Sequence, residues 1–576
     1  MASFKPAPVH IHAHLAIEDP SKCGRLPDDV LCAIFNVCAS LDPPYREETD
    51  NEGEVRYSLG WISIGHACRR WRTILLSLSP LWASIICTFP NAAPEIVSRA
   101  RDAPLSFTNP YMRGGFVQDS LVQLALSHIS RVRRLRLGAN SRVDAKYRYA
   151  INEALTSRPL PLLEEFDVHV YHRPGRSADV YNRSSTGQFD PALRLEAPSL
   201  RSFTHCDLFT FTCPMLTSLS TTLWGIDAES YTRHLMDMLR GFPLLRTLSI
   251  GLRYGDVRTP GADRGRGGIL TTNIPLSISP WTTCMRQPVT LDHLRDAHVS
   301  GTPRADVFGF WSCLRTPADT NIELVGLDLA EVIEPACHVL EHQLHDAALD
   351  TLVVRCPGEL TVGVVLRRSR ERRRTAGRHE IGLHTGVCRT EYKEMPGIMR
   401  TLVSALRADC IRHLNLLSLE NDGYYDDEEM RRALEPLTAV SVVSIHASKG
   451  VGGILRMLRP REDGGAVPFA RLDTLVVHMR KIPGEYETWH TECWSALTSV
   501  LHQRHRVHVP VREVRITGGW STESMRSDLA GVESPYLDDV RDVVTVVRDK
   551  RIIKGIAEEG CMYYYTDLEV ETDEEG

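Results

Sequence analysis

The chain has 576 residues, of which 43% are hydrophobic and 24% are charged, and its formal net charge at pH 7 is -6. These shares are close to globular averages, and so small a charge for this length indicates no general attraction to nucleic acid or to a membrane surface. The first residues lack the apolar stretch of a signal peptide and no run of about 18 apolar residues occurs, so we expect a cytoplasmic or nuclear protein that does not span a membrane.

The first sustained pattern begins at residue 26, since residues 1–24 show no period and are expected to form a disordered leader. A proline and two aspartates then precede apolar residues at helical spacing, which predicts a short amphipathic helix. Residues 41–58 are acidic, contain two prolines and have no apolar face, so they predict a solvated loop. Residues 59–75 predict a second helix, which Pro80 prevents from continuing.

Beyond residue 130 a short motif recurs: an apolar residue, two spacers, an apolar residue, one spacer and a third apolar residue. Each copy predicts a short strand, because strand side chains alternate between two faces. Many neighbouring copies are about 30 residues apart, with helical stretches or Pro-x-Leu phrases between them, which resembles leucine-rich repeats. The full copies begin at Val132, Leu163, Leu245, Ile322, Leu349, Ile411, Val440, Leu472 and Val511, and partial copies begin at Leu200, Leu216 and Leu291.

The predicted fold class is therefore α/β, with an irregular leucine-rich-repeat-like solenoid of parallel short strands and helices over residues 131–520. Residues 88–130 are expected to be linker helices. A Gly-rich stretch at 254–268 and an arginine-dense segment at 367–378 predict insertions into the array. Residues 521–576 predict a C-terminal helix, from 536 to about 556, and an acidic tail.

Residues 25–87 resemble the F-box of large fungal families. In the F-box, a Leu-Pro phrase opens a helix that ends in Ile-Phe, and a later Cys-Arg-Arg-Trp phrase leads to Leu-Trp. The corresponding residues here are Leu26 and Pro27, Ile34 and Phe35, Cys68 to Trp71, and Leu81 and Trp82. The acidic stretch after Leu41 separates the two helices by more than a compact F-box does.

The resemblance implies that this segment docks on a Skp-type adaptor, and through it on a cullin. The chain would then be the substrate-recruiting subunit of a Skp-cullin-F-box ubiquitin ligase and not itself an enzyme, because its contribution would be to hold a target close to the ubiquitin-transferring partner. The alternative is a non-catalytic repeat scaffold that binds a Skp adaptor or another protein without ubiquitin transfer. The implied adaptor-binding residues are Leu26, Pro27, Leu31, Ile34, Phe35, Cys68, Trp71, Leu81 and Trp82.

In each predicted strand, the residues between the marked apolar ones point away from the helices. Each of them alone is expected to be a solvated side chain, whereas together they predict a surface that binds a target protein. The residues assigned to this surface are Arg136, Asp167, Ser249, Asn415, Ser444 and Arg515, together with Gly326, Val353 and Val476.

Other chemistries find little support in the sequence. The 15 cysteines are scattered singly, and no phosphate-binding loop or hydrolase motif occurs, so we expect no metal, no cofactor and no catalytic residue. Cys493 and His490 could form a reactive pair, but the flanking tryptophans at helical spacing favour packing. The arginine segment could drive nuclear import or bind nucleic acid, but it lacks interleaved aromatics, so we expect a solvated loop and no nucleic-acid partner.

Overall fold

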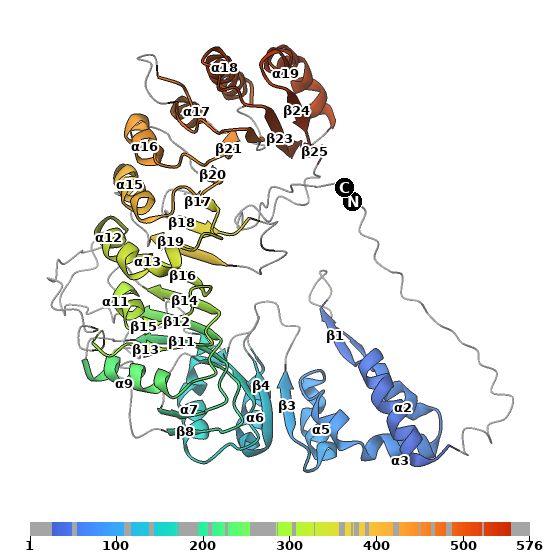
Figure 1. Ribbon diagram of the computed structural model, residues 1–576. Coiled ribbons are helices and arrows are strands. Elements are labelled where there is room, and N and C mark those ends of the chain that lie inside the picture. The colour runs from blue at the N-terminus through green and yellow to red at the C-terminus, as the bar shows by residue number, and fades with distance from the viewer. Residues whose placement is uncertain are drawn as a thin grey trace, which may run out of the picture. The chain divides into compact units, whose positions relative to one another are not determined.

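The computed structural model is a mixed α/β protein with a large, mostly parallel sheet and many helices (Figure 1). By internal contacts the chain divides into two compact units, one formed by Met1–Arg176 with Leu195–Leu200 and the other by Ser177–Arg194 with Arg201–Gly576. The structure describes residues 26–48, 55–108, 117–137, 143–168, 170–171, 194–205, 210–224, 229–253, 281, 284, 286–301, 307–327, 329–355, 363–369, 373, 379–385, 391–418, 426–447, 451–461, 467–479, 486–520 and 523–553.

The first unit begins with a small helical core. Helix α2 (Asp28–Leu41) follows Pro27, with two aspartates in its first turn, where the positive end of the helix dipole stabilises carboxylates. The predicted second helix is instead divided, because η1 (Gly60–His66) is a 3-10 helix and α3 (Arg69–Ser77) starts afresh at Cys68. The thiol of Cys68 accepts a hydrogen bond from the backbone N–H of Trp71 at 3.4 Å and so caps α3. Helix α4 (Ser79–Ala83) follows at once.

The acidic stretch between the helices is a β-hairpin, which corrects the predicted loop. Strands β1 (Tyr45–Glu48) and β2 (Val55–Ser58) pair antiparallel. The ring of Tyr57 stacks on that of Phe89, with centroids 5.8 Å apart, and so ties the hairpin to the rest of the unit. The sequence stretch has no apolar face, but cross-strand backbone pairing does not require one.

The remainder of the first unit contains three parallel neighbouring strands. Strand β4 pairs with β3 on one side and with β6 on the other. The region expected to hold only linker helices therefore also contributes strand β3. The bounds are α5 (Ala93–Ala100), β3 (Leu105–Thr108), α6 (Asp119–Ser127), β4 (Val132–Arg136), α7 (Arg148–Thr156) and β6 (Glu165–Asp167).

The second unit is built on one long sheet. Pairing runs in the order β9, β11, β12, β14, β16, β19, β18, β17, β20, β21, β22, β23 and β24. All of these pairings are parallel except those of β18, which is antiparallel to both neighbours. The bounds are β9 (Ser202–His205), β11 (Ser218–Trp224), β12 (Thr247–Arg253), β14 (Asp296–Gly301), β16 (Asn321–Leu327), β17 (Thr351–Arg355), β18 (Gly363–Arg367), β19 (Glu380–Thr385), β20 (His413–Ser418), β21 (Val442–Ala447), β22 (Thr474–Met479), β23 (Glu513–Trp520), β24 (Val546–Asp549) and β25 (Ile552–Ile553).

The helices of this unit line one face of the sheet, and successive helices pack against each other (Figure 1). The strand residues that face them are the apolar positions that the repeated motif predicts, such as Leu475 and Val477, both fully buried. We call the opposite face of the sheet the open face, because no helix of the described residues packs on it. The bounds are α9 (Glu229–Arg240), α11 (Val307–Ser312), α12 (Leu329–Val339), α13 (Glu341–Leu344), α15 (Met395–Ala405), α16 (Asp427–Leu434), α17 (Val451–Met457), α18 (Tyr486–Arg506) and α19 (Glu523–Val543).

Two predictions for this unit need correction. In β16 the motif was assigned in the wrong frame: Ile322 and Leu324 are buried against the helices, whereas Val325 faces the other way. The last helix, α19, runs over Glu523–Val543 and not over 536–556, because the chain then forms β24 and pairs with β23. Backbone pairing at the sheet edge therefore overrides the helical pattern after residue 543.

Candidate interaction surfaces

Three of the nine predicted adaptor-binding residues form the core of the first helical segment. Leu31 and Phe35 are 0% exposed and Trp82 is 3% exposed. The ring of Phe35 meets that of Trp71 edge to face, with centroids 5.6 Å apart. The indole N–H of Trp82 donates to the carbonyl of Leu75 at 2.9 Å. These side chains hold α2, α3 and α4 together, and Leu31, Phe35 and Trp82 are not accessible to a partner.

The start of α2 is tied to α3 by Arg70. Its guanidinium donates to the carbonyl of Leu26 at 2.6 Å and to the carboxylate of Asp28 at 2.5 Å. Among the other predicted residues, Pro27 and Cys68 are exposed, whereas Leu26, Ile34, Trp71 and Leu81 are half-buried. The structure thus brings the two F-box-like phrases side by side, with part of their surface open to solvent.

A second apolar face of α2 points to solvent. Val30, Val37 and Leu41 are 38%, 56% and 78% exposed, and the half-buried Ile34 lies between them. Positions 30, 34, 37 and 41 lie on one side of a helix, because 3.6 residues make one turn. We call these four residues the α2 stripe. Val37 and Leu41 were missed in the sequence, although their spacing from Val30 was sufficient to find them.

The residues assigned to the target-binding surface fall into both units. In the first unit Arg136 of β4 lies opposite Asp167 of β6, and the guanidinium of Arg136 also pairs with Glu165 at 3.0 Å. In the second unit Asn415, Ser444 and Arg515 lie in one row across β20 to β23, with Val476 between the last two.

Ser249 lies further along the same sheet and is the register partner of His298. Ser249, Asn415, Ser444, Val476 and Arg515, five of the nine assigned residues, therefore lie on the open face of the second unit.

The middle of the open face holds a group of histidines and one carboxylate. Nδ1 of His298 is 2.9 Å from one oxygen of Glu323, and Nε2 of His384 is 3.8 Å from the other. The ring of His384 covers Gly363 of β18 and Gly382 of β19, where a Cβ atom would collide with it. The two glycines therefore make room for an imidazole that lies flat on the sheet.

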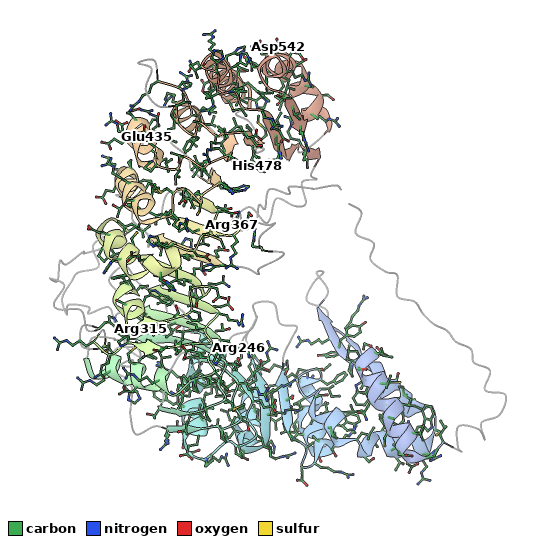
Figure 2. The ribbon with its side chains drawn as sticks, in the orientation of Figure 1. Arg246, Arg315, Arg367, Glu435, His478 and Asp542 are labelled. Carbon is green, nitrogen blue, oxygen red and sulfur yellow. The ribbon has the colours of Figure 1, made fainter. Side chains whose placement is uncertain are left out.

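The C-terminal part of the open face carries a second pair of histidines. His446 of β21 and His478 of β22 are register partners, and their rings stack with centroids 5.6 Å apart. Nδ1 of His478 lies 3.2 Å from the hydroxyl of Thr517 on β23. In Figure 2 the side chains of His478 and Arg367 lie on the helix-free side of the sheet, whereas Glu435 lies on the helix side.

The last two strands add an ion-pair group to this face. The guanidinium of Arg515 makes two bonds to the carboxylate of Glu513, at 2.8 and 3.0 Å, and Arg548 of β24 pairs with the same carboxylate at 2.9 Å. The hydrogen bond from Arg515 is the main reason why the pKa of Glu513 is lowered. One carboxylate thus compensates two guanidinium groups.

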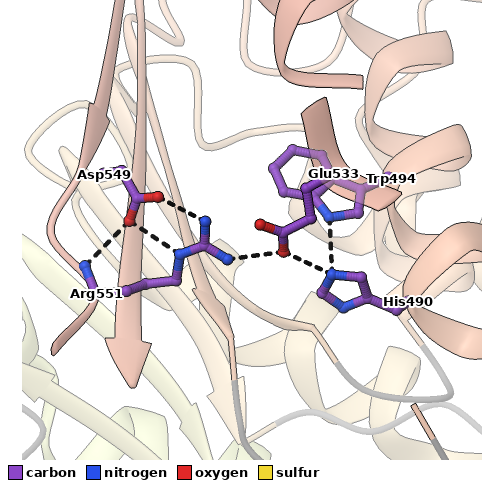
Figure 3. A network of polar contacts seen from close by, with 5 residues as sticks. All are labelled: His490, Trp494, Glu533, Asp549 and Arg551. Carbon is purple, nitrogen blue, oxygen red and sulfur yellow. Dashed lines mark hydrogen bonds and ion pairs between the residues drawn. The ribbon is translucent and has the colours of Figure 1, made fainter. Parts of the chain in front are cut away.

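The sequence neighbours His490 and Cys493 belong to a buried structural network, not to a reactive pair. His490 Nε2 lies 2.6 Å from Glu533 of α19, and Arg551 donates to the same carboxylate oxygen at 2.7 Å (Figure 3). Arg551 also binds Asp549 through two nitrogens, at 2.9 and 2.5 Å. Burial raises the pKa of the Cys493 thiol to about 12, so this thiol stays protonated and is not a nucleophile.

The protonation of this network follows from its geometry. Burial alone would raise the pKa of Glu533, but the hydrogen bonds of His490 and Arg551 outweigh it, so the pKa is lowered and the carboxylate is ionised. The indole N–H of Trp494 also approaches Nε2 of His490, at 3.2 Å. One ring nitrogen cannot donate to Glu533 and accept from Trp494 at once, and the shorter contact with an anion favours the proton on Nε2.

The described ends of the arginine segment are structural. Arg368 pairs with Asp346 at 3.3 Å, and the buried His379 lies 2.9 Å from the same carboxylate. Residues 370–372 and 374–378 lie outside the described part of the chain, as do the leader 1–24, the Gly-rich stretch 254–268 and the acidic tail after residue 553.

Within the described residues no group of three metal-ligating side chains could hold a metal ion, and no helix is long and apolar enough to cross a bilayer. In comparisons with known proteins, no family model matches the chain and no curated sequence matches it.

Proposed function

We propose that this chain is the substrate-recruiting subunit of a Skp-cullin-F-box ubiquitin ligase. Residues 25–87 act as its F-box, and the second unit is a leucine-rich-repeat-like solenoid whose open face holds the target. Ubiquitin transfer is the work of partner proteins, and this chain contributes proximity. The proposal rests above all on the α2 stripe.

The α2 stripe supports docking because α2 is apolar on two sides. One side carries Leu31 and Phe35 and is fully used by the internal core. The other side carries Val37 and Leu41, which are more than half exposed and gain nothing from that core. A contiguous, exposed apolar row on a helix is typical of a surface that packs against a partner helix. The motif order of the F-box names the partner that we propose, a Skp-type adaptor.

The chemistry of the open face favours a protein over a small molecule as the bound target. Its side chains are distributed over many strands and mix hydroxyls, imidazoles, an amide and ion pairs, as in the row from Asn415 to Arg515. A small-molecule site is usually a concave apolar pocket with a few converging polar groups. An extended, chemically mixed sheet face suits a protein surface better.

The test of docking uses substitutions that spare the core. The double variant V37D/L41D places two charges in the stripe, and we expect it to reduce co-purification of the Skp adaptor by at least about tenfold, because each carboxylate would have to be desolvated in the interface. The matched control is N36D/S40D, which adds two charges at exposed positions of the same helix but outside the stripe. Equal recovery of the adaptor with both variants would refute docking through α2.

Recovery of a cullin with the wild-type chain tests the ligase itself. A chain that retains the adaptor but never a cullin would be a scaffold without ubiquitin transfer.

A further inference from the structure

The C-terminal part of the open face has an unbalanced charge. We define this C-terminal open face by six residues on β20 to β24, of which Ser444 and His446 are buried, whereas Asn415, His478, Arg515 and Arg548 are at least partly exposed. The side chains of these strands that point to the open face include a single carboxylate, Glu513, which two guanidinium groups share, and Asp473, directly before β22, acts on Arg515 but also pairs with Arg512. The half-buried imidazole of His478 adds a hydrogen-bonding group. This surface therefore suits an acidic segment.

The chain carries such a segment directly beyond the described part. Residues 557–576 contain eight carboxylates and no lysine or arginine. The described chain ends in β25 (Ile552–Ile553), which pairs with Gly519 and Trp520 at the carboxyl end of β23. The described chain thus ends, four residues before the acidic segment, at the edge of the sheet where His478 and Thr517 also lie, since both are near the carboxyl ends of their strands.

The segment is long enough to cross the face. Three strand spacings separate β23 from β20, which is about 14 Å at about 4.8 Å per spacing. An extended chain covers about 3.3 Å per residue, so some five residues are sufficient for the crossing. Attachment to the same chain gives the segment an effective concentration in the millimolar range, so that even weak contacts keep it bound.

We propose that residues 557–576 bind across the C-terminal open face and occupy it in competition with a partner. Carboxylates of the segment lie against Arg515, Arg548 and His478. The contact itself is independent of adaptor docking, whereas its effect on target binding rests on the proposed function. A target for this part of the sheet has to displace an acidic segment and is therefore itself acidic or carries other anionic groups.

Cys561 makes the contact measurable in the full chain by disulfide formation. It lies eight residues after Ile553, a reach of about 26 Å, which includes β20. The variant N415C places a thiol on the C-terminal open face. The control R541C places one on the exposed side of α19, which packs on β23 and β24 and is also within reach. Both variants are oxidised under mild conditions, and the disulfide of Cys561 is identified by peptide mapping.

We expect the disulfide at position 415 to form at least about tenfold faster than that at position 541, because binding raises the local concentration of the segment at the open face. The excess is expected to disappear when the eight carboxylates are changed to amides. If N415C misfolds, T517C, which places a thiol on β23 of the same face, is tested in its place.

Equal rates at the open-face and helix positions, or an excess that survives removal of the carboxylates, would overturn the proposal. The readout needs neither adaptor nor cullin, so a negative result leaves α2 docking untouched, and a failure of docking leaves this contact untouched.

Discussion

Removal of Arg551 tests whether the buried network at the end of the second unit stabilises the terminal helices. The side chain of Arg551 is 4% exposed, and that of its partner Glu533 is 2% exposed. The variant R551M keeps most of the volume but leaves His490 as the remaining hydrogen-bond partner of Glu533 in this network. Breaking a buried pair in this way costs about 3–5 kcal/mol. Asp549, the other partner, is 42% exposed and regains water, so we expect about 3 kcal/mol, the lower end.

Hydrogen exchange read amide by amide is the suitable assay, because a chain with two units need not unfold in one step. A loss of about 3 kcal/mol corresponds to roughly 150-fold faster exchange in α18, α19 and β24. The matched control is R541M, which breaks the exposed pair of Arg541 with Asp538 and is expected to change nothing measurable. The double variant R551M/E533Q should cost less than the sum of its two single variants, since it removes the stranded charge. Unchanged protection in R551M would refute the reasoning.

Three further predictions concern single residues. Arg504 is 0% exposed and donates to the carbonyls of Leu458, Pro468 and Phe469, so R504M removes a donor from three buried carbonyls and should destabilise the loop before β22 by about 3 kcal/mol, measured by hydrogen exchange of that loop. Gly518 has φ +103 and a Cβ there would collide with the carbonyl of Met479, so G518A should lower the melting temperature. Gly531 lies in helix α19 with open space around it, so G531A should instead stabilise the folded protein by about 0.5–1 kcal/mol. Burial and nearby arginines lower the pKa of His413 below its ordinary 6.5, so the unfolded chain binds that proton more tightly. Stability should therefore be full above pH 6.5 and fall as the pH drops below it, and H413Q should flatten this dependence in urea unfolding curves.

The sequence was sufficient to predict the strands that alternate cleanly. Leu248 and Ile250, or Leu475 and Val477, are separated by one residue and bury against the helices as the motif indicates. The reason is physical, because one buried face forces a period of two. The pairing partners of β18 could not be predicted in this way. Its run from Val364 to Leu366 is apolar throughout and buried on both faces, so no alternation shows its orientation.

The candidate sites were predictable to different degrees. Helical spacing correctly groups Leu31 with Phe35, but it does not tell which apolar face of α2 is used inside the unit and which is left exposed. That choice depends on the tryptophans of η1, α3 and α4, which come later in the chain. The bond between Glu533 and Arg551 joins a helix to the segment after a sheet-edge strand, and no local pattern marks it.

The antiparallel strand β18 has a consequence for how cooperatively the second unit unfolds. In an uninterrupted array each strand is stabilised by the next repeat, so disruption at one end spreads along the whole stack. Here β16 pairs with β19, β20 pairs with β17, and β18 joins the two parallel stacks within the sheet, while α12 packs against α15 across the same junction. Among the described elements, the two stacks are therefore coupled through one antiparallel strand and helix packing, and not through continuous parallel pairing.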